Sequence, residues 1–342
     1  MRMRVVTVAW VLPFASGAGC GAGTDSTQMA GPSAAASSGS SASGAATPRI
    51  EDALVILHRL QKIADRNGGN RFSGTKGYDD SVAYLRDRLE RAGLHTSVQH
   101  FAMRDGTTTS NVLAELPGGS GRVLMVGAHL DSVKAGPGIN DNGSGSATLV
   151  AVAQALARTG YRPRDTVRFA FWGAEERGLQ GSLHYVKGLK DAEKAQLSGY
   201  VNFDMTATKG GAYGIVDAAK SSLADLPKKV RGDFAQIPFA AGSVRLQKVL
   251  TRAYQDQGAP VTPDLTTVTA TDIRPFLAKA PTVPVGGIVM LSANPRKQKG
   301  RPIVAPCYHR KCDTTANIDT TALGRGMGAL HQTITELAGT AS

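Results

Sequence analysis

Apolar and polar residues along the chain form patterns that predict helices and strands in alternation. Between Asp79 and Ala92 apolar residues recur every three or four positions, which predicts an amphipathic helix that ends at Gly93. Helical spacing recurs near 149–156 and 181–189. Short runs rich in β-branched and aromatic residues predict strands at 95–103, 111–116, 123–126, 167–172 and 200–203.

The turn residues between these elements help to order them. Pro117, Gly118 and Gly119 predict a hairpin-type turn that makes the strands on either side neighbours. Strands that alternate with helices predict an α/β fold, here a single globular domain over residues 48–342. We expect a mixed, largely parallel central β-sheet flanked by helices on both faces, with ligands beyond the carboxyl ends of its strands.

The first fifty residues differ in composition from the rest of the chain. Positive charge in MRMR precedes an apolar run too short to span a bilayer comfortably, so residues 1–20 predict an export signal. GAGC, which ends at Cys20, resembles the lipobox of bacterial lipoproteins, although Gly17 stands where a branched apolar residue is usual. Lipidation of Cys20 with attachment to the cell envelope and simple cleavage with secretion both remain open.

Two further features follow from composition. Residues 21–47 are mainly Gly, Ala, Ser and Thr, which predicts a flexible linker. Cys307 and Cys312 lie close together in CYHRKC, and in an exported protein we expect them to form a disulfide. A thiolate metal site is the alternative, but two cysteines around one histidine fall short of the usual structural zinc spacing.

The chain is strongly basic, with a formal net charge of +12 and a pI near 9.8. Its basic residues are scattered, apart from one loop, and show no aromatic interleaving or nucleic-acid-binding module. The loop carries Arg296, Lys297, Lys299 and Arg301. We therefore expect a solvated basic surface that is attracted to an anionic cell envelope, and no nucleic-acid partner.

Three of the predicted strands end in acidic residues or histidine, and two more such residues lie on loops. The candidate metal ligands are His129, Asp141, Glu176, Asp204 and His309. Carboxylates and imidazoles without thiolates suit zinc, and five ligands hold two ions if one carboxylate bridges them. Each residue alone has an ordinary explanation as a solvated or core side chain, but together they predict a dimetal site.

The order of motifs from Asn70 to Leu337 resembles the M28 zinc aminopeptidases, especially the compact secreted double-zinc enzymes of Streptomyces and Vibrio. The motifs are NRFSGTKGYDDSVAYLRDRLERAGL, VGAHLDSV, GINDNGSG, FWGAEERGLQGS, YVNFDM, TDIRPF, PVGGIV and CYHRKCDT. The resemblance implies that His129 and Asp204 hold one zinc ion, that Glu176 and His309 hold the other, and that Asp141 bridges the two Zn²⁺ ions.

The resemblance also implies three roles around the ions. Asp131 would orient the His129 imidazole. Glu175 would be the general base, because a carboxylate next to a ligand reaches the shared water without occupying a coordination site. Tyr308 would donate a hydrogen bond to the oxygen that gains charge in the tetrahedral intermediate, and the cysteine pair would brace its turn.

The resulting expectation is an exported, monomeric zinc aminopeptidase that acts on peptides with a free N-terminus. A carboxypeptidase or a glutaminyl cyclase on the same fold is an alternative, and a non-catalytic cell-surface binding protein is an alternative of another class. The chain departs from the family pattern at 206–242, 280–284 and 287–307. We expect these segments to line the side-chain pocket, so a preference for large apolar N-terminal residues depends on them.

Overall fold

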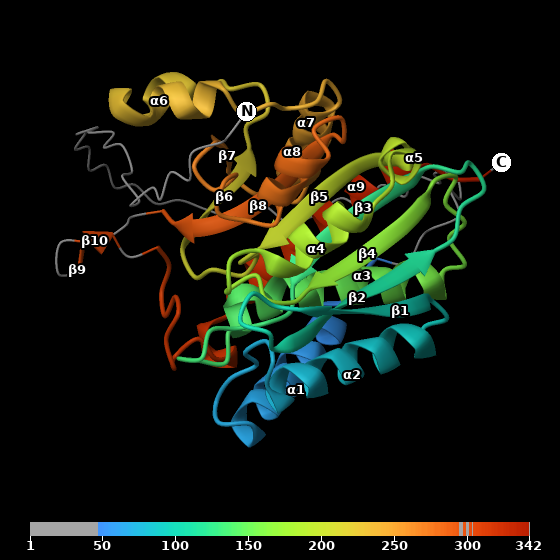
Figure 1. The fold of residues 1–342 in the computed structure, drawn as a ribbon, viewed down its shortest axis with the longest axis vertical. Helices are drawn as coiled ribbons and strands as arrows, with labels where there is room; N and C mark the ends of the chain where they lie inside the picture. Colours follow the sequence, from blue (N-terminus) through green and yellow to red (C-terminus); the bar gives the residue numbers. More distant parts are fainter. Residues whose placement is uncertain (1–46, 294–296, 299–300, 303, 342) are drawn as a thin grey trace, which may run out of the picture.

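A computed structural model describes residues 47–293, 297–298, 301–302 and 304–341 (Figure 1). The predicted export signal, Cys20 and nearly all of the predicted linker lie outside this part of the chain, as do Arg296 and Lys299 of the basic loop. Within it, no helix combines the length and the apolar character needed to cross a membrane.

The centre of the structure is an eight-stranded sheet in the order β1-β2-β4-β3-β5-β8-β6-β7 (Figure 1). Its strands are β1 (His95–Ala102), β2 (Thr108–Leu116), β3 (Val123–His129), β4 (Thr166–Trp172), β5 (Leu197–Asp204), β6 (Gly211–Val216), β7 (Val261–Asp264) and β8 (Val285–Ser292). β9 (Lys297–Gln298) and β10 (Arg301–Pro302) pair separately with each other. The four central strands β4, β3, β5 and β8 run parallel, which confirms a mixed, largely parallel sheet.

The predicted hairpin at Pro117–Gly119 is wrong, because β4 lies between β2 and β3. β1 and β2 form the antiparallel hairpin instead, and β2 pairs antiparallel with β4. The turn docks on the beginning of β4: the Gly118 N–H donates to Thr166 Oγ1 at 2.9 Å, and a Cβ at Gly118 would overlap the backbone of residues 164–166. The chain therefore passes beside β4 before it returns to the sheet as β3.

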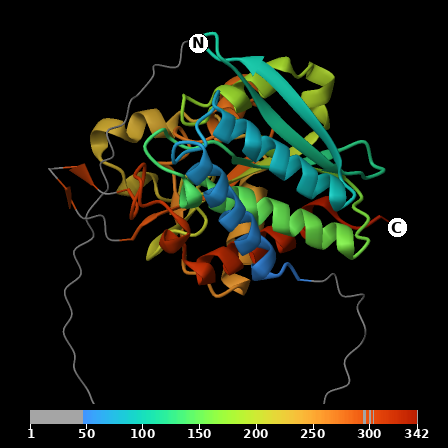
Figure 2. The same ribbon diagram turned by 90° about the horizontal axis from the view of Figure 1, so that it is seen from below.

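Helices cover both faces of the sheet, as predicted (Figures 1 and 2). One face packs against α1 (Ile50–Arg66), α2 (Lys76–Arg91), α3 (Gly145–Arg158), α7 (Ser243–Asp256) and α9 (Thr320–Ala338). The other packs against α4 (Gln180–Gly188) and α8 (Ile273–Lys279), and α6 (Lys228–Ala235) joins the same apolar cluster through Phe234. A short helix α5 (Asp191–Gln196) precedes β5, and single helical turns lie at η1 (Ile139–Ser144), η2 (Leu223–Asp225) and η3 (Thr315–Asn317).

Helix α3 sets the position of the polar loop that precedes it. Every residue of Gly145–Leu156 is buried, because small and apolar side chains on all sides of the helix pack between neighbouring helices and the sheet. The turn η1 leads directly into α3, with Asp141 and Asn142 outside helical φ and ψ values. The rigid helix thus holds the loop that carries Asp141 at the carboxyl end of β3.

Candidate metal centre

The candidate ligands gather at one edge of the sheet because the strands that carry them are parallel neighbours. His129 is the last residue of β3 and pairs in register with Trp172, the last residue of β4. Asp204 ends β5, on the other side of β3. The segment after β4 brings Glu175 and Glu176 to the same edge. The expected clustering at the strand ends is present in the structure.

Two overlapping groups of ligand atoms meet at Asp141. In the first group His129 Nε2 lies 3.2 Å from Asp141 Oδ1 and 3.6 Å from Asp204 Oδ1. In the second group His309 Nε2 lies 3.2 Å from Asp141 Oδ2 and 3.0 Å from Glu176 Oε2. Asp141 therefore turns one carboxylate oxygen towards each group, which is the arrangement that a bridging ligand requires.

The site concentrates negative charge in a place that is shielded from water. Burial raises the pKa of Asp204 and raises the pKa of Glu176 to about 7. Burial opposes the charged form of His309, but its bonds to Asp141 and Glu176 outweigh that effect and raise its pKa to about 10. Burial likewise opposes the charged form of His129, but the charge of Glu175 and bonds to nearby aspartates outweigh it and raise the pKa of His129 well above its ordinary value. Positive charge close to these carboxylates would therefore stabilise their ionised forms.

Asp131 links a candidate ligand to the candidate base. The Glu175 N–H donates to Asp131 Oδ1 at 3.1 Å. His129 Nδ1 lies 3.2 Å from the Asp131 carbonyl oxygen and 3.5 Å from Asp131 Oδ1. Asp131 is fully buried, so these contacts hold it beside both residues. The His129 imidazole is consequently oriented by the backbone of Asp131 at least as closely as by its carboxylate.

Glu175 and Tyr308 line the same pocket as the ligands. Glu175 Oε2 lies 3.9 Å from His129 Nε2, and burial raises the pKa of the Glu175 carboxyl well above its ordinary value. Glu175 belongs to neither ligand group. The Tyr308 ring stacks on the His309 ring with centroids 3.7 Å apart, and burial raises the pKa of its hydroxyl, which keeps it a hydrogen-bond donor.

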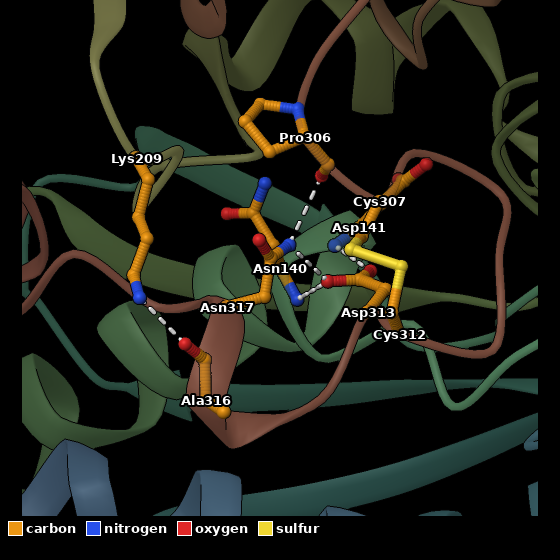
Figure 3. Close-up of a disulfide and its surroundings, with 9 residues drawn as sticks. All are labelled: Asn140, Asp141, Lys209, Pro306, Cys307, Cys312, Asp313, Ala316 and Asn317. Carbon is orange, nitrogen blue, oxygen red and sulfur yellow. Dashed lines mark hydrogen bonds between the residues drawn. A yellow bond between two sulfur atoms is a disulfide. The ribbon is translucent and has the colours of Figure 1, made fainter.

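A disulfide joins Cys307 and Cys312, whose Cα atoms lie 5.3 Å apart (Figure 3). The closed loop between them carries Tyr308 and His309. Gly136 lets the β3–η1 loop pass directly over this loop, because a Cβ at Gly136 would overlap the Arg310 carbonyl oxygen. The two loops that supply Asp141 and His309 are therefore in backbone contact.

Arg71 holds the β3–η1 loop from the side of α1 and α2, and its role was not apparent from the sequence. Its guanidinium is fully buried and donates to the carbonyl oxygens of Leu130, Pro137 (3.0 Å) and Gly138 (2.7 Å). Burial lowers the pKa of Arg71 to about 10, so the side chain stays charged at neutral pH. One planar group thus satisfies three carbonyl groups of the loop.

We expect Arg71→Lys to lower the free energy of unfolding by about 2–4 kcal/mol, because an ammonium group cannot reproduce the three-way fork. Urea denaturation measures this change. Arg158→Lys is the control: Arg158 is partly exposed and its ion pair with Asp52 should be worth less than about 1 kcal/mol. Equal losses in the two variants would contradict the structural role of Arg71.

The side-chain pocket beside the ligands has a mainly apolar wall. It consists of Met205, Thr267, Ala270, Thr271, Val289, Leu291 and Val304. Of the three segments expected to line it, only 287–307 contributes among the described residues, whereas 206–242 and 280–284 do not. The rest of the wall comes from the loop that precedes α8 and from Met205, which directly follows β5, while Val289, Leu291 and Val304 belong to the 287–307 segment.

The model of peptidase family M28 matches residues 111–334, which include all the candidate ligands. This chain belongs to peptidase family M28. The M28 chain is 38% identical to leupeptin-inactivating enzyme 1 of Streptomyces exfoliatus over 89% of its own length and 66% of that protein. It is also 38% identical to leucine aminopeptidase 2 of Trichophyton rubrum, over 68% of this chain and 46% of the relative. It therefore spans about half to two thirds of these relatives.

Solved structures share the fold of the M28 chain at low sequence identity. A zinc aminopeptidase from Bacillus subtilis matches with a TM-score of 0.68 and 15% identity, covering 86% of this chain and 96% of that one. A glutaminyl cyclase from Porphyromonas gingivalis matches with a TM-score of 0.62 and 18% identity, covering 85% and 97%. Proteins named for different reactions thus share this fold, so the fold alone does not determine the activity.

The side chains of the M28 chain fit zinc ions. All the donors are imidazole nitrogens or carboxylate oxygens, and within each group the ligand atoms lie within 4.8 Å of one another. Glu176 Oε1 and Asp204 Oδ1 are buried without a hydrogen-bond partner. A buried carboxylate oxygen with no partner is costly, and a bound cation would remove that cost.

The sequence predicted no role for two buried acidic residues near the site, Asp272 and Asp313. Asp272, in the TDIRPF motif, accepts a hydrogen bond from Ser182 Oγ, and burial raises its pKa to about 7. Asp313 follows the second cysteine and binds the backbone of the loop that carries Asp141. The position of Asp313 next to a predicted disulfide could have marked it as a structural residue. Its hydrogen-bond partners could not be predicted, because they lie far away in the sequence.

Proposed function

We propose that the protein is an exported aminopeptidase that holds two zinc ions and hydrolyses the N-terminal peptide bond of peptides. The observation that carries the proposal is the pair of ligand groups that share Asp141. His129 and Asp204 would hold one ion, Glu176 and His309 the other. Bound zinc supplies a water of lowered pKa and polarises the carbonyl group of the substrate.

The chain itself would supply the proton transfers and the orientation. Glu175 is buried, lines the pocket and is not needed as a ligand, so it would take the proton of the attacking water and pass it to the leaving amine. Asp131 holds the backbone of Glu175 and the ring of His129 in place. Tyr308 would donate a hydrogen bond to the substrate oxygen as negative charge develops on it.

The substrate would be a peptide with a free N-terminus. The apolar wall of Met205, Val289, Leu291 and Val304 suits an uncharged aliphatic side chain. One curated relative carries the name leucine aminopeptidase 2, which supports the same substrate class. The first twenty residues support export, with Cys20 as a candidate lipid attachment site, and we propose a monomer.

The test compares leucine p-nitroanilide with three other substrates. They are its N-acetylated form, an N-acetylated peptide with a free C-terminus that only a carboxypeptidase would shorten, and glutamine amide. We expect hydrolysis of substrates that have a free amine and none of the N-acetylated ones, loss of this activity on treatment with a zinc chelator and its return when zinc is added. Cleavage from the C-terminus, or cyclisation of the glutamine substrate without hydrolysis, would replace the proposal with a carboxypeptidase or a cyclase. A protein that binds no zinc and hydrolyses nothing would favour a binding role.

A further inference from the structure

Three consecutive backbone N–H groups of the metal-site loop are bound by a single residue, Asp313, and Figure 3 shows two of their residues, Asn140 and Asp141, beside it. The Ile139 N–H donates to the Asp313 carbonyl oxygen at 3.0 Å. The Asn140 N–H donates to Oδ1 and the Asp141 N–H to Oδ2, each at 3.0 Å. One carboxylate, 172 residues further along the chain, therefore fixes the backbone of Asp141.

Asp313 is itself held firmly in position. It is only 2% exposed, and Asn317 Nδ2 donates to its Oδ1 at 3.0 Å and to the Pro306 carbonyl oxygen at 3.1 Å. The Asp313 N–H donates to the Arg310 carbonyl oxygen at 3.0 Å. Hydrogen bonds to an ionised carboxylate are roughly twice as strong as those between neutral groups. The Asn317 amide and the N–H groups of Asn140 and Asp141 together fix the orientation of the carboxylate.

Asp313 directly follows the disulfide-closed loop that carries His309. Cys312 directly precedes Asp313, and its disulfide to Cys307 closes the loop that contains His309 (Figure 3). Asp141 contacts this turn twice, through its N–H to Asp313 Oδ2 and through its Oδ2 to His309 Nε2 at 3.2 Å. Asp313 therefore ties the backbone of Asp141 to the turn that presents His309.

We propose that Asp313 is a positioning residue for the bridging carboxylate, which sets the spacing between Asp141 and His309 that the metal ions require. The proposal rests on the dizinc function proposed above. Metal ligands must lie within a few tenths of an ångström of their ideal positions, and a side chain on an irregular loop keeps such a position only if its backbone is fixed. Arg71 binds the carbonyl groups of this loop and Asp313 binds its N–H groups.

The substitution Asp313→Asn tests the proposal, because asparagine has the same shape as aspartate but only one acceptor oxygen in place of two. Its NH2 group would face either the Asn140 or the Asp141 N–H, so one bond would be replaced by repulsion. We expect Asp313→Asn to weaken zinc binding by about 10–100-fold, measured on the metal-free protein by competition with a chromophoric chelator. Activity should return with excess zinc while KM stays nearly unchanged, since Asp313 does not line the pocket.

Asp217→Asn is the matched control. Asp217 is also fully buried and accepts a backbone N–H, that of Ser222 at 2.6 Å, but its side-chain partners are Ser221, Ser222 and Gln247 outside the metal site. We expect it to lower the thermal midpoint as Asp313→Asn does and to leave zinc affinity unchanged. Equal zinc affinity in wild type and Asp313→Asn would overturn the proposal.

Asn317→Ala keeps the proposal testable if Asp313→Asn does not fold. It removes one donor that orients the Asp313 carboxylate and leaves the carboxylate itself in place. We expect zinc affinity to fall by about 10-fold, the lower end of the range for residues that support a ligand. Unchanged affinity in this folded variant would also overturn the proposal. Wild-type protein that binds no zinc would instead overturn the dizinc function and this inference together.

Discussion

Glu175→Gln should retain both zinc ions and lose nearly all peptidase activity. Glutamine keeps the size of the side chain and its place in the pocket but cannot take a proton from water, so kcat should fall by about 10²–10⁴-fold. KM should change little, because the variant keeps the candidate ligands and the apolar wall that would bind the substrate. The measurements are steady-state kinetics on leucine p-nitroanilide and the zinc content of the purified variant.

Glu176→Gln is the comparison that separates a base from a ligand. Glu176 Oε2 lies 3.0 Å from His309 Nε2 and belongs to the second ligand group, whereas its neighbour Glu175 belongs to neither. We expect Glu176→Gln to lose zinc and to recover part of its activity when zinc is added. Full activity of Glu175→Gln with two ions bound would show that the base has been assigned to the wrong glutamate.

Asp141→Asn should disturb both metal positions together. The two carboxylate oxygens of Asp141 face different histidines, at 3.2 Å each, and an amide offers one neutral oxygen in place of two charged ones. We expect zinc affinity to fall at both positions and kcat to drop by more than the roughly 10–100-fold typical of residues that only support a ligand.

His129→Ala is the control for Asp141→Asn, because His129 belongs to one ligand group only. It should weaken mainly the ion that His129 shares with Asp204. Stepwise zinc titration of the metal-free proteins distinguishes a loss at one position from a loss at both. An Asp141→Asn variant that loses only one ion and keeps the other at wild-type affinity would mean that Asp141 does not bridge.

Local pattern predicted some elements well and left others unnoticed. Helices α2, α3 and α4 and strands β1 to β5 lie close to their predicted positions, because apolar periodicity and turn residues are local properties. Helix α1 is not among the predicted elements, although Ile56, Leu57, Leu60 and Ile63 follow helical spacing and are buried. The Pro117–Gly119 turn does not join neighbouring strands, because strand order depends on which strands are free to pair and β4 comes later in the chain.

The sequence by itself determined the chemical inventory: histidines and acids at the ends of apolar runs, a cysteine pair around His309, and the family to which the motifs belong. It could do so because residue types and their spacing along the chain show which side chains are available as metal ligands. Only the tertiary structure decided which residues meet. Arg71 binds carbonyl groups of the Asp141 loop from 59 to 67 positions away in the chain, and Asp313 binds its N–H groups from 172 and 173 positions away. Long-range contacts of this kind leave no periodic signal.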